Sequence, residues 1–140
     1  MEMFFLPPIP AGFPSPAELS SEYPLDANAL LCLTPDATRY VRVAGPSMRD
    51  ARIFDGDVLV IDQRIEPVHG DIIIAQLRDT YTLRRYFLVD GRVVLEAAHP
   101  RYPPIIVTAA MHYECWGVVL FVISARHPLA RSRLLPVKHP

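Results

Sequence analysis

This chain of 140 residues is short of cysteine, of lysine and of long apolar runs, and each shortage excludes a class of protein. Its two cysteines, Cys32 and Cys115, are too few and too unpatterned for a disulfide framework or a zinc site. We therefore expect a reduced, cytoplasmic protein without a bound metal. The apolar stretch Met1–Ile9 is short, is interrupted by prolines and has no Lys or Arg before it, so we expect neither a signal peptide nor a membrane span.

Charge of either sign is not in excess, since the formal net charge at pH 7 is −1. We therefore expect neither a nucleic acid nor a membrane surface as a direct partner. The sequence contains no glycine-rich loop of the kind that cradles nucleotide phosphates, and we expect no cofactor. The 14 basic residues are nearly all arginine, and Lys138 is the only lysine. This bias limits the choice of a catalytic base, because arginine stays protonated in proteins.

The length and an apolar content of 51% predict one domain with a substantial core. After residue 34, short runs rich in β-branched and aromatic residues predict a mainly β fold, in which antiparallel sheets curl around one core. Asp90-Gly91 is a strong hairpin signal between two of these runs. The expected strands cover residues 40–44, 58–61, 72–77, 81–89, 92–96, 105–107 and 115–124.

Two segments flank the predicted β domain, which spans residues 25–124. Residues 1–24 hold six prolines and predict an extended arm, whose apolar side chains we expect to lie in a groove of this chain or of a partner. Within the arm, Ala11-Gly12 is either a flexible joint or a peptide bond small enough to enter a narrow active site. Asp26 predicts the start of a short helix. Residues 125–140 are a basic tail, for which we expect a frayed, solvated end.

A serine follows the first expected strand of the β domain at a sharp turn. Gly45-Pro46 ends that strand, because proline has no N–H to continue a ladder. The hydroxyl of Ser47 can then point into a cleft beside backbone N–H groups, which is how a nucleophile is commonly displayed. The alternative is that Ser47 only stabilises its own turn.

Aspartates cluster around two further glycines of the β domain. They could supply oxygen ligands to a hard cation, but their placement favours carboxylates that accept hydrogen bonds from N–H groups of their own turns. We therefore predict turn carboxylates rather than a metal site at Asp55, Asp57, Asp62 and Asp71.

Several motifs stand in a recognisable order over roughly residues 10–124: Gly45-Pro46-Ser47-Met48, Asp55-Gly56-Asp57, His69-Gly70-Asp71-Ile72, Tyr81-Thr82-Leu83-Arg84-Arg85, Tyr102, Pro104-Ile105 and Gly117-Val118-Val119. Together they resemble the LexA/UmuD family of self-cleaving serine peptidases, family S24. The short arm, in place of a DNA-binding head, resembles UmuD rather than a LexA repressor. The resemblance implies the β fold of the LexA/UmuD C-terminal domain with an extended N-terminal arm.

The resemblance also implies a site and a set of partners. In this family a serine attacks a peptide bond in the chain's own arm, and a lysine removes the serine's proton. Ser47 matches the nucleophile, Ala11-Gly12 matches the scissile bond, and the N–H groups of Ser47 and Met48 would stabilise the oxyanion. The family further implies a homodimer whose cleavage is promoted by a RecA–single-stranded-DNA filament, and which then joins a UmuC-like Y-family DNA polymerase for translesion synthesis in the SOS response.

The sequence departs from the family at the base. The lysine position is occupied by Arg84, which can donate hydrogen bonds to Ser47 but cannot remove its proton, because the pKa of arginine lies above ~12. Lys138 lies beyond the domain, the turn pattern gives His69 a structural place, and His99 stands where the family often has Asn. Either a natural member has lost cleavage, or a lysine was replaced in an engineered chain to keep the arm uncut.

Two functions follow from this departure. The first is an SOS accessory protein that self-cleaves by a Ser/Lys-type mechanism, with cleavage disabled by Arg84. The second is a non-catalytic pseudo-peptidase that acts only as a dimeric polymerase-binding module. A leader peptidase of similar chemistry is disfavoured, because such an enzyme needs a membrane anchor.

Overall fold

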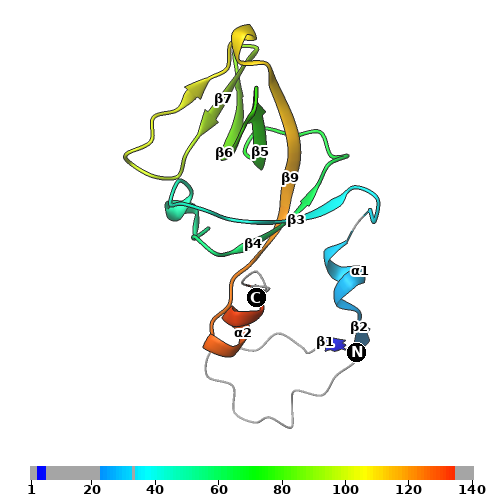
Figure 1. The fold of residues 1–140 in the computed structure, drawn as a ribbon. Helices are drawn as coiled ribbons and strands as arrows, with labels where there is room; N and C mark the ends of the chain where they lie inside the picture. The colour runs from blue at the N-terminus through cyan, green and yellow to red at the C-terminus, as the bar shows by residue number, and fades with distance from the viewer. Residues whose placement is uncertain (1–2, 6–22, 33, 135–140) are drawn as a thin grey trace. The chain divides into compact units, whose positions relative to one another are not determined.

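The computed structural model describes residues 3–5, 23–32 and 34–134, in two compact units that comprise residues 1–33 and 34–140 (Figure 1). In the first unit, β1 (Met3–Phe5) and β2 (Tyr23–Leu25) pair antiparallel, and α1 (Ala27–Leu31) follows. Asp26 caps α1 as predicted, since its Oδ1 accepts a hydrogen bond of 2.9 Å from the N–H of Asn28. Ala11-Gly12 lies outside the described residues.

The second unit is a seven-stranded antiparallel sheet with the order β3-β4-β9-β5-β6-β7-β8. The prediction of a mainly β, antiparallel fold is confirmed. The strands β6 (Thr80–Val89) and β7 (Arg92–Glu96) are joined at Asp90-Gly91, where both residues have positive φ, as the hairpin signal predicts. The strands are β3 (Thr38–Arg42), β4 (Val58–Asp62), β5 (Ile72–Leu77), β6 (Thr80–Val89), β7 (Arg92–Glu96), β8 (Ile105–Ile106) and β9 (Tyr113–Ile123).

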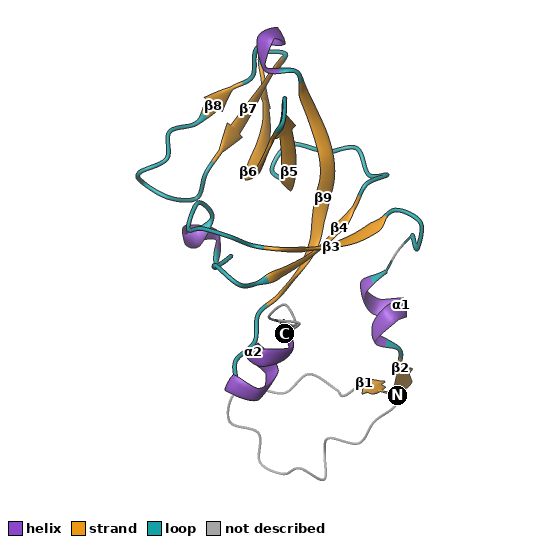
Figure 2. Cartoon of the chain, in the orientation of Figure 1, coloured by secondary structure: helices purple, strands orange, loops and turns teal. Residues whose placement is uncertain are grey.

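Strand β9 joins the two halves of the sheet (Figure 2). Its C-terminal part pairs with β4 and its N-terminal part with β5, and the register shifts once in each pairing. Gly117 lies where the partner of β9 changes from β5 to β4. Ile61 packs so closely there that a Cβ on Gly117 would be 2.5 Å from Ile61 Cδ1. The absence of a side chain at this position therefore allows the two halves to meet.

The core consists of two apolar clusters rather than the single core that we expected. One contains Met48, Ile61 and Ile74, and the other contains Ile73 and Leu95. Because successive side chains of a strand point to opposite faces, the adjacent residues of β5 supply different clusters. Met48 is only 1% exposed, so the turn that carries Ser47 is anchored in the first cluster.

The described part of the basic tail differs from the frayed form that we expected, because α2 (Pro128–Leu134) is helical. Proline is well suited to the first turn of a helix, and the ring Nδ1 of His127 accepts a hydrogen bond of 3.1 Å from the N–H of Leu129. His127-Pro128 is therefore a sequence signal for the start of this helix. No helix among the described residues is long and apolar enough to cross a membrane.

Candidate functional site

The turn after β3 is held by the loop that precedes β4. Val43 exchanges backbone hydrogen bonds with this loop, its N–H donating to the carbonyl of Asp57 and its carbonyl accepting from Gly56, both at 2.8 Å. Gly45, with a φ of 89°, donates its N–H to Asp55 Oδ1 at 2.9 Å. The motif Asp55-Gly56-Asp57 therefore positions the residues that lead to Ser47, although it lies eight or more residues further along the chain.

Asp57, Asp62 and Asp71 accept hydrogen bonds within their own turns, as the sequence predicted, whereas Asp55 bonds Gly45 of the preceding turn. Asp57 is buried, and its Oδ2 accepts a hydrogen bond of 2.9 Å from Phe54 N–H. Asp62 and Asp71 accept hydrogen bonds from Arg64 N–H at 2.7 Å and Val68 N–H at 2.9 Å. Across residues 3–5, 23–32 and 34–134, no group of three or more His, Cys, Asp or Glu side chains is placed to hold a metal ion.

Ser47 lines a cleft of about 260 Å³ between the end of β3 and the start of β6. The side chain of Met48, directly after it, points into the core, so Ser47 is held at the rim of this cleft in a half-buried position. The other lining residues are Val41, Arg42, Val43, Ala44, Leu59, Ile74, Tyr81, Thr82 and Leu83. Residues 41–44 and residues 81–83 thus line the cleft as two extended segments, an arrangement suited to an extended peptide.

Two amide donors lie at the serine. In the described part of the chain, neither the N–H of Ser47 nor that of Met48 donates to a protein acceptor. The turn closes through other atoms, because Arg49 N–H donates to the carbonyl of Pro46 at 3.0 Å and Ile53 N–H to that of Met48 at 3.2 Å. Successive N–H groups without internal partners, beside a serine hydroxyl, can stabilise an oxyanion.

Arg84 is buried on β6, one residue after the segment that lines the cleft. It pairs with Ile73 of β5 and is only 9% exposed. Its Nη1 donates to the carbonyl of Leu83 at 2.9 Å, and its Cζ lies 5.8 Å from the centre of the Tyr102 ring. Burial lowers the pKa of Arg84 below its ordinary value, an effect that Tyr102 partly opposes.

The guanidinium of Arg84 has few polar contacts for a buried cation. Within the described residues, its Nε is buried without a hydrogen-bond acceptor, and no carboxylate lies within ion-pair distance of it. An uncompensated buried charge is unfavourable. The same desolvation would depress the pKa of a lysine, so this position provides the environment that a neutral amine base requires.

Arg84 and Ser47 are joined indirectly, through a loop. Arg84 is not among the residues that line the Ser47 cleft, whereas its neighbour Leu83 is. Its partner Tyr102 belongs to the loop after β7, and that loop accepts a hydrogen bond of 2.7 Å from Asp50 N–H at the carbonyl of Ala98. No sequence pattern pairs Arg84 with Tyr102, because 17 residues and a strand separate them.

The other candidate bases are held elsewhere or lie outside the described residues. His69 accepts a hydrogen bond from Leu88 N–H at 3.1 Å through Nδ1, and its ring packs against Phe87, in keeping with a structural role. His99 Nδ1 accepts from Arg101 N–H at 3.0 Å, and its ring contacts that of Tyr102. Lys138 lies beyond residue 134 and is not described.

The architecture and the cleft define a class: a mainly β protein that presents a serine between two extended segments. Comparison with protein families gives the class a name. The Peptidase S24-like family model matches residues 5–120, and this chain belongs to the S24 peptidase family, as the motifs predicted.

Curated relatives of UmuD type agree with this assignment. The chain is 36% identical to Protein MucA of Salmonella typhimurium over 127 residues, which cover 90% of this chain and 86% of MucA. It is 38% identical to Protein SamA of Salmonella typhimurium over 112 residues, 74% of this chain and 79% of SamA. A LexA repressor of Halorhodospira halophila is 40% identical over 101 residues, which cover 72% of this chain but only 44% of that repressor.

Proposed function

We propose that this chain is a UmuD-like accessory protein of SOS mutagenesis whose serine peptidase site is complete except for its base. Membership of the S24 family and similarity to MucA and SamA support the first part. Arg84 supports the second, because a guanidinium cannot accept the proton of Ser47 at physiological pH. On this proposal the arm remains attached, whereas a relative with a lysine at this position would cut it at Ala11-Gly12.

In the mechanism of a member with a lysine base, Ser47 attacks the carbonyl carbon of Ala11 while a neutral amine takes its proton. The N–H groups of Ser47 and Met48 hold the resulting oxyanion, which is worth ~3 kcal/mol in comparable sites. The amine then gives this proton to the nitrogen of Gly12 as the Ala11–Gly12 bond breaks, and water hydrolyses the ester left on Ser47. The tethered arm has a high effective concentration at the cleft, so a slow catalyst suffices. Arg84 interrupts this sequence at its first proton transfer and leaves the binding of the arm unaffected.

Three features of the described residues support the proposal. The cleft beside Ser47 is open, the two amides are free of protein acceptors in the described region, and the base position is buried and desolvated. A lysine at position 84 would therefore enter an environment that lowers the pKa of its amine.

The proposed partners follow from the family. They are a second copy of the chain, a RecA–single-stranded-DNA filament and a UmuC-like Y-family polymerase, and the proposed location is the cytoplasm. A second function deserves equal testing: a pseudo-peptidase that works only as a dimeric polymerase-binding module. The same residue favours it, because Arg84 cannot accept the proton of Ser47 and a binding function does not require Ser47 to react.

The deciding experiment compares the natural chain with Arg84→Lys, incubated with an activated RecA filament or at alkaline pH. Mass spectrometry should find a fragment that begins at Gly12 only for Arg84→Lys, and none for Arg84→Lys combined with Ser47→Ala. Failure of Arg84→Lys to give this fragment would overturn the peptidase assignment. Cleavage of the natural chain would overturn the role given to Arg84.

The pseudo-peptidase alternative has its own readout. In a strain without its native UmuD-type protein, Ser47→Ala in the natural chain should leave damage-induced mutagenesis unchanged if only binding matters. A loss of mutagenesis in that variant, with normal protein levels, would show that Ser47 chemistry is still required.

A further inference from the structure

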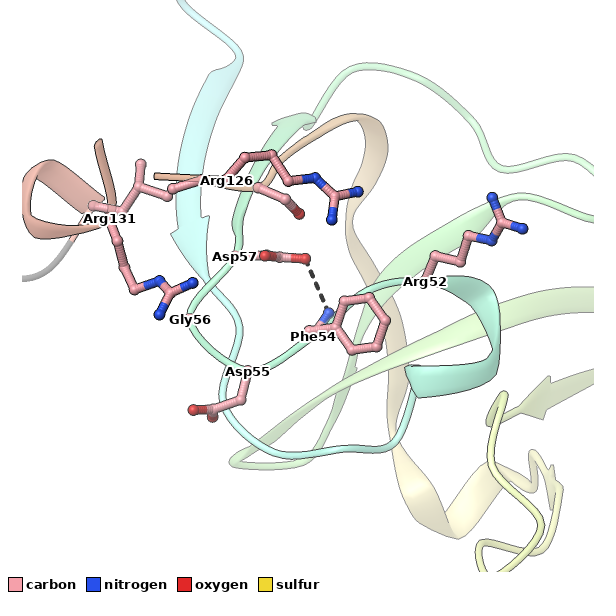
Figure 3. A pocket seen from close by; sticks show the side chains of 10 residues that line it. Arg52, Phe54, Asp55, Gly56, Asp57, Arg126 and Arg131 are labelled. Carbon is pink, nitrogen blue, oxygen red and sulfur yellow. Dashed lines mark hydrogen bonds between the residues drawn. The ribbon is translucent and has the colours of Figure 1, made fainter. Parts of the chain in front are cut away.

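A second hollow in the unit of residues 34–140 shares no lining residue with the Ser47 cleft. It lies between the turn Phe54–Asp57, the end of β9 and α2, and has a volume of about 690 Å³ (Figure 3). Three arginines line it: Arg52 precedes the turn, Arg126 follows β9 and Arg131 belongs to α2. Arg126 and Arg131 come from the C-terminal side of the hollow. The proposed function makes no use of this hollow.

The two arginines face the hollow with their charges uncompensated. In the view of Figure 3, the Arg131 side chain extends toward Gly56, and the Arg126 side chain extends past Asp57, with its guanidinium on the opposite side of Asp57. Among residues 34–134, neither the Arg126 nor the Arg131 guanidinium forms an ion pair or a hydrogen bond. A guanidinium presents a planar fork of donors that matches a carboxylate, so two such groups at one hollow can receive an acidic side chain.

The remaining lining distinguishes a peptide from a nucleic acid. Phe54 is 49% exposed and Leu134 also lines the hollow, so apolar surface lies beside the two cations. The carboxylates of Asp55 and Asp57, held by hydrogen bonds to Gly45 and Phe54, border the same space and would repel a continuous row of phosphates. A single carboxylate next to an apolar group fits this mixture better.

We infer that this hollow binds a peptide segment of a partner protein in which an acidic side chain stands next to an apolar one. Arg126 and Arg131 receive the carboxylate, and Phe54 and Leu134 receive the apolar side chain. Charge complementarity and the exposed aromatic ring supply the reason for this choice. The site would give the chain a docking surface that does not depend on cleavage of its arm.

The test measures binding of a fluorescent hexapeptide of alternating glutamate and leucine to the full chain by anisotropy at low salt. Arg126→Glu and Arg131→Glu should each weaken binding about tenfold or more, because each replaces a charge-assisted contact with a repulsive one. Phe54→Ala should also weaken it. Arg133→Glu is the matched control: the residue is exposed on the same helix, does not line the hollow and should bind the peptide as the natural chain does.

The controls distinguish binding of the peptide at this hollow from nonspecific electrostatic attraction. A hexapeptide with glutamine in place of glutamate should lose most of its affinity for the natural chain, a result that needs no folded variant. An equal loss of affinity in Arg133→Glu would overturn the proposal in favour of nonspecific charge. Absence of peptide binding would also overturn the proposal. If a single-stranded oligonucleotide binds more tightly than the peptide, and Arg126→Glu abolishes its binding, the hollow would be assigned to nucleic acid instead.

Discussion

The guanidinium carbon of Arg84 lies 5.8 Å from the centre of the Tyr102 ring, and this contact ties β6 to the loop after β7. The same loop is bonded to the serine turn through Asp50 N–H and the carbonyl of Ala98, at 2.7 Å. The residue at the position that we propose for the base thus contributes to the structure around the site. Replacing it will affect both the chemistry and the packing, and the two effects can be measured separately.

The first prediction concerns the pH dependence of cleavage in Arg84→Lys. Burial lowers the pKa of the group at this position, and a lysine acts as a base only when neutral. The rate of arm cleavage should therefore rise with pH and level off once the amine is deprotonated, as followed by gel electrophoresis over a pH series. Arg85→Lys, one residue away, should leave the arm uncut at every pH. A flat profile for Arg84→Lys would show that the lysine is not the base.

The second prediction concerns the Arg84–Tyr102 contact. Tyr102→Leu should lower the free energy of unfolding by roughly 1 kcal/mol, because the face of the ring no longer attracts the buried cation. Tyr102→Phe keeps the ring and should remain close to the natural chain, as urea unfolding would report. Equal losses in the two variants would assign the effect to the phenol hydroxyl instead.

The third prediction uses the close approach of β9 and β4. Gly117→Ala should destabilise the fold by about 1–3 kcal/mol, because the new Cβ would lie 2.5 Å from Ile61 Cδ1. Ile61→Val removes that methyl group, so the double variant should recover part of the loss. A double-mutant cycle from thermal or urea unfolding gives the coupling. Additive effects would mean that the two residues do not compete for space.

The fourth prediction concerns a phenol buried in the second cluster. The hydroxyl of Tyr113 is buried and finds no hydrogen-bond partner in the described residues. Tyr113→Phe keeps the ring and removes this unpaired group, so it should stabilise the fold by about 1 kcal/mol at neutral pH. Destabilisation in urea unfolding would show that the hydroxyl is satisfied in solution.

The same residue makes the fold sensitive to alkali. Burial raises the pKa of Tyr113 above its ordinary value of 10.0, so the folded state retains the proton that the unfolded state releases. The stability of the fold is therefore independent of this ionisation below pH 10.0 and falls as the pH rises further. Stability measured from pH 9 to 11 should therefore fall less steeply in Tyr113→Phe, with Tyr81→Phe as the exposed control.

Much of the fold followed from local patterns. The apolar runs, the Asp90-Gly91 hairpin and the cap at Asp26 depend on neighbours in sequence, and the structure confirms them. The motif order led to the S24 family, which the family comparison confirms. The roles of Ser47, Met48 and Arg84, and the cut at Ala11-Gly12, stay predictions.

The arrangement around these residues depends on contacts between distant segments, and no local pattern encodes such contacts. The sequence by itself determined that residue 84 carries a permanent positive charge, because an arginine side chain stays protonated in proteins. Only the tertiary structure decided that this cation is buried against Tyr102, that two clusters share β5, and that Arg126 and Arg131 line one hollow. Each results from sheet pairing and the packing of α2, which bring together side chains far apart in the chain.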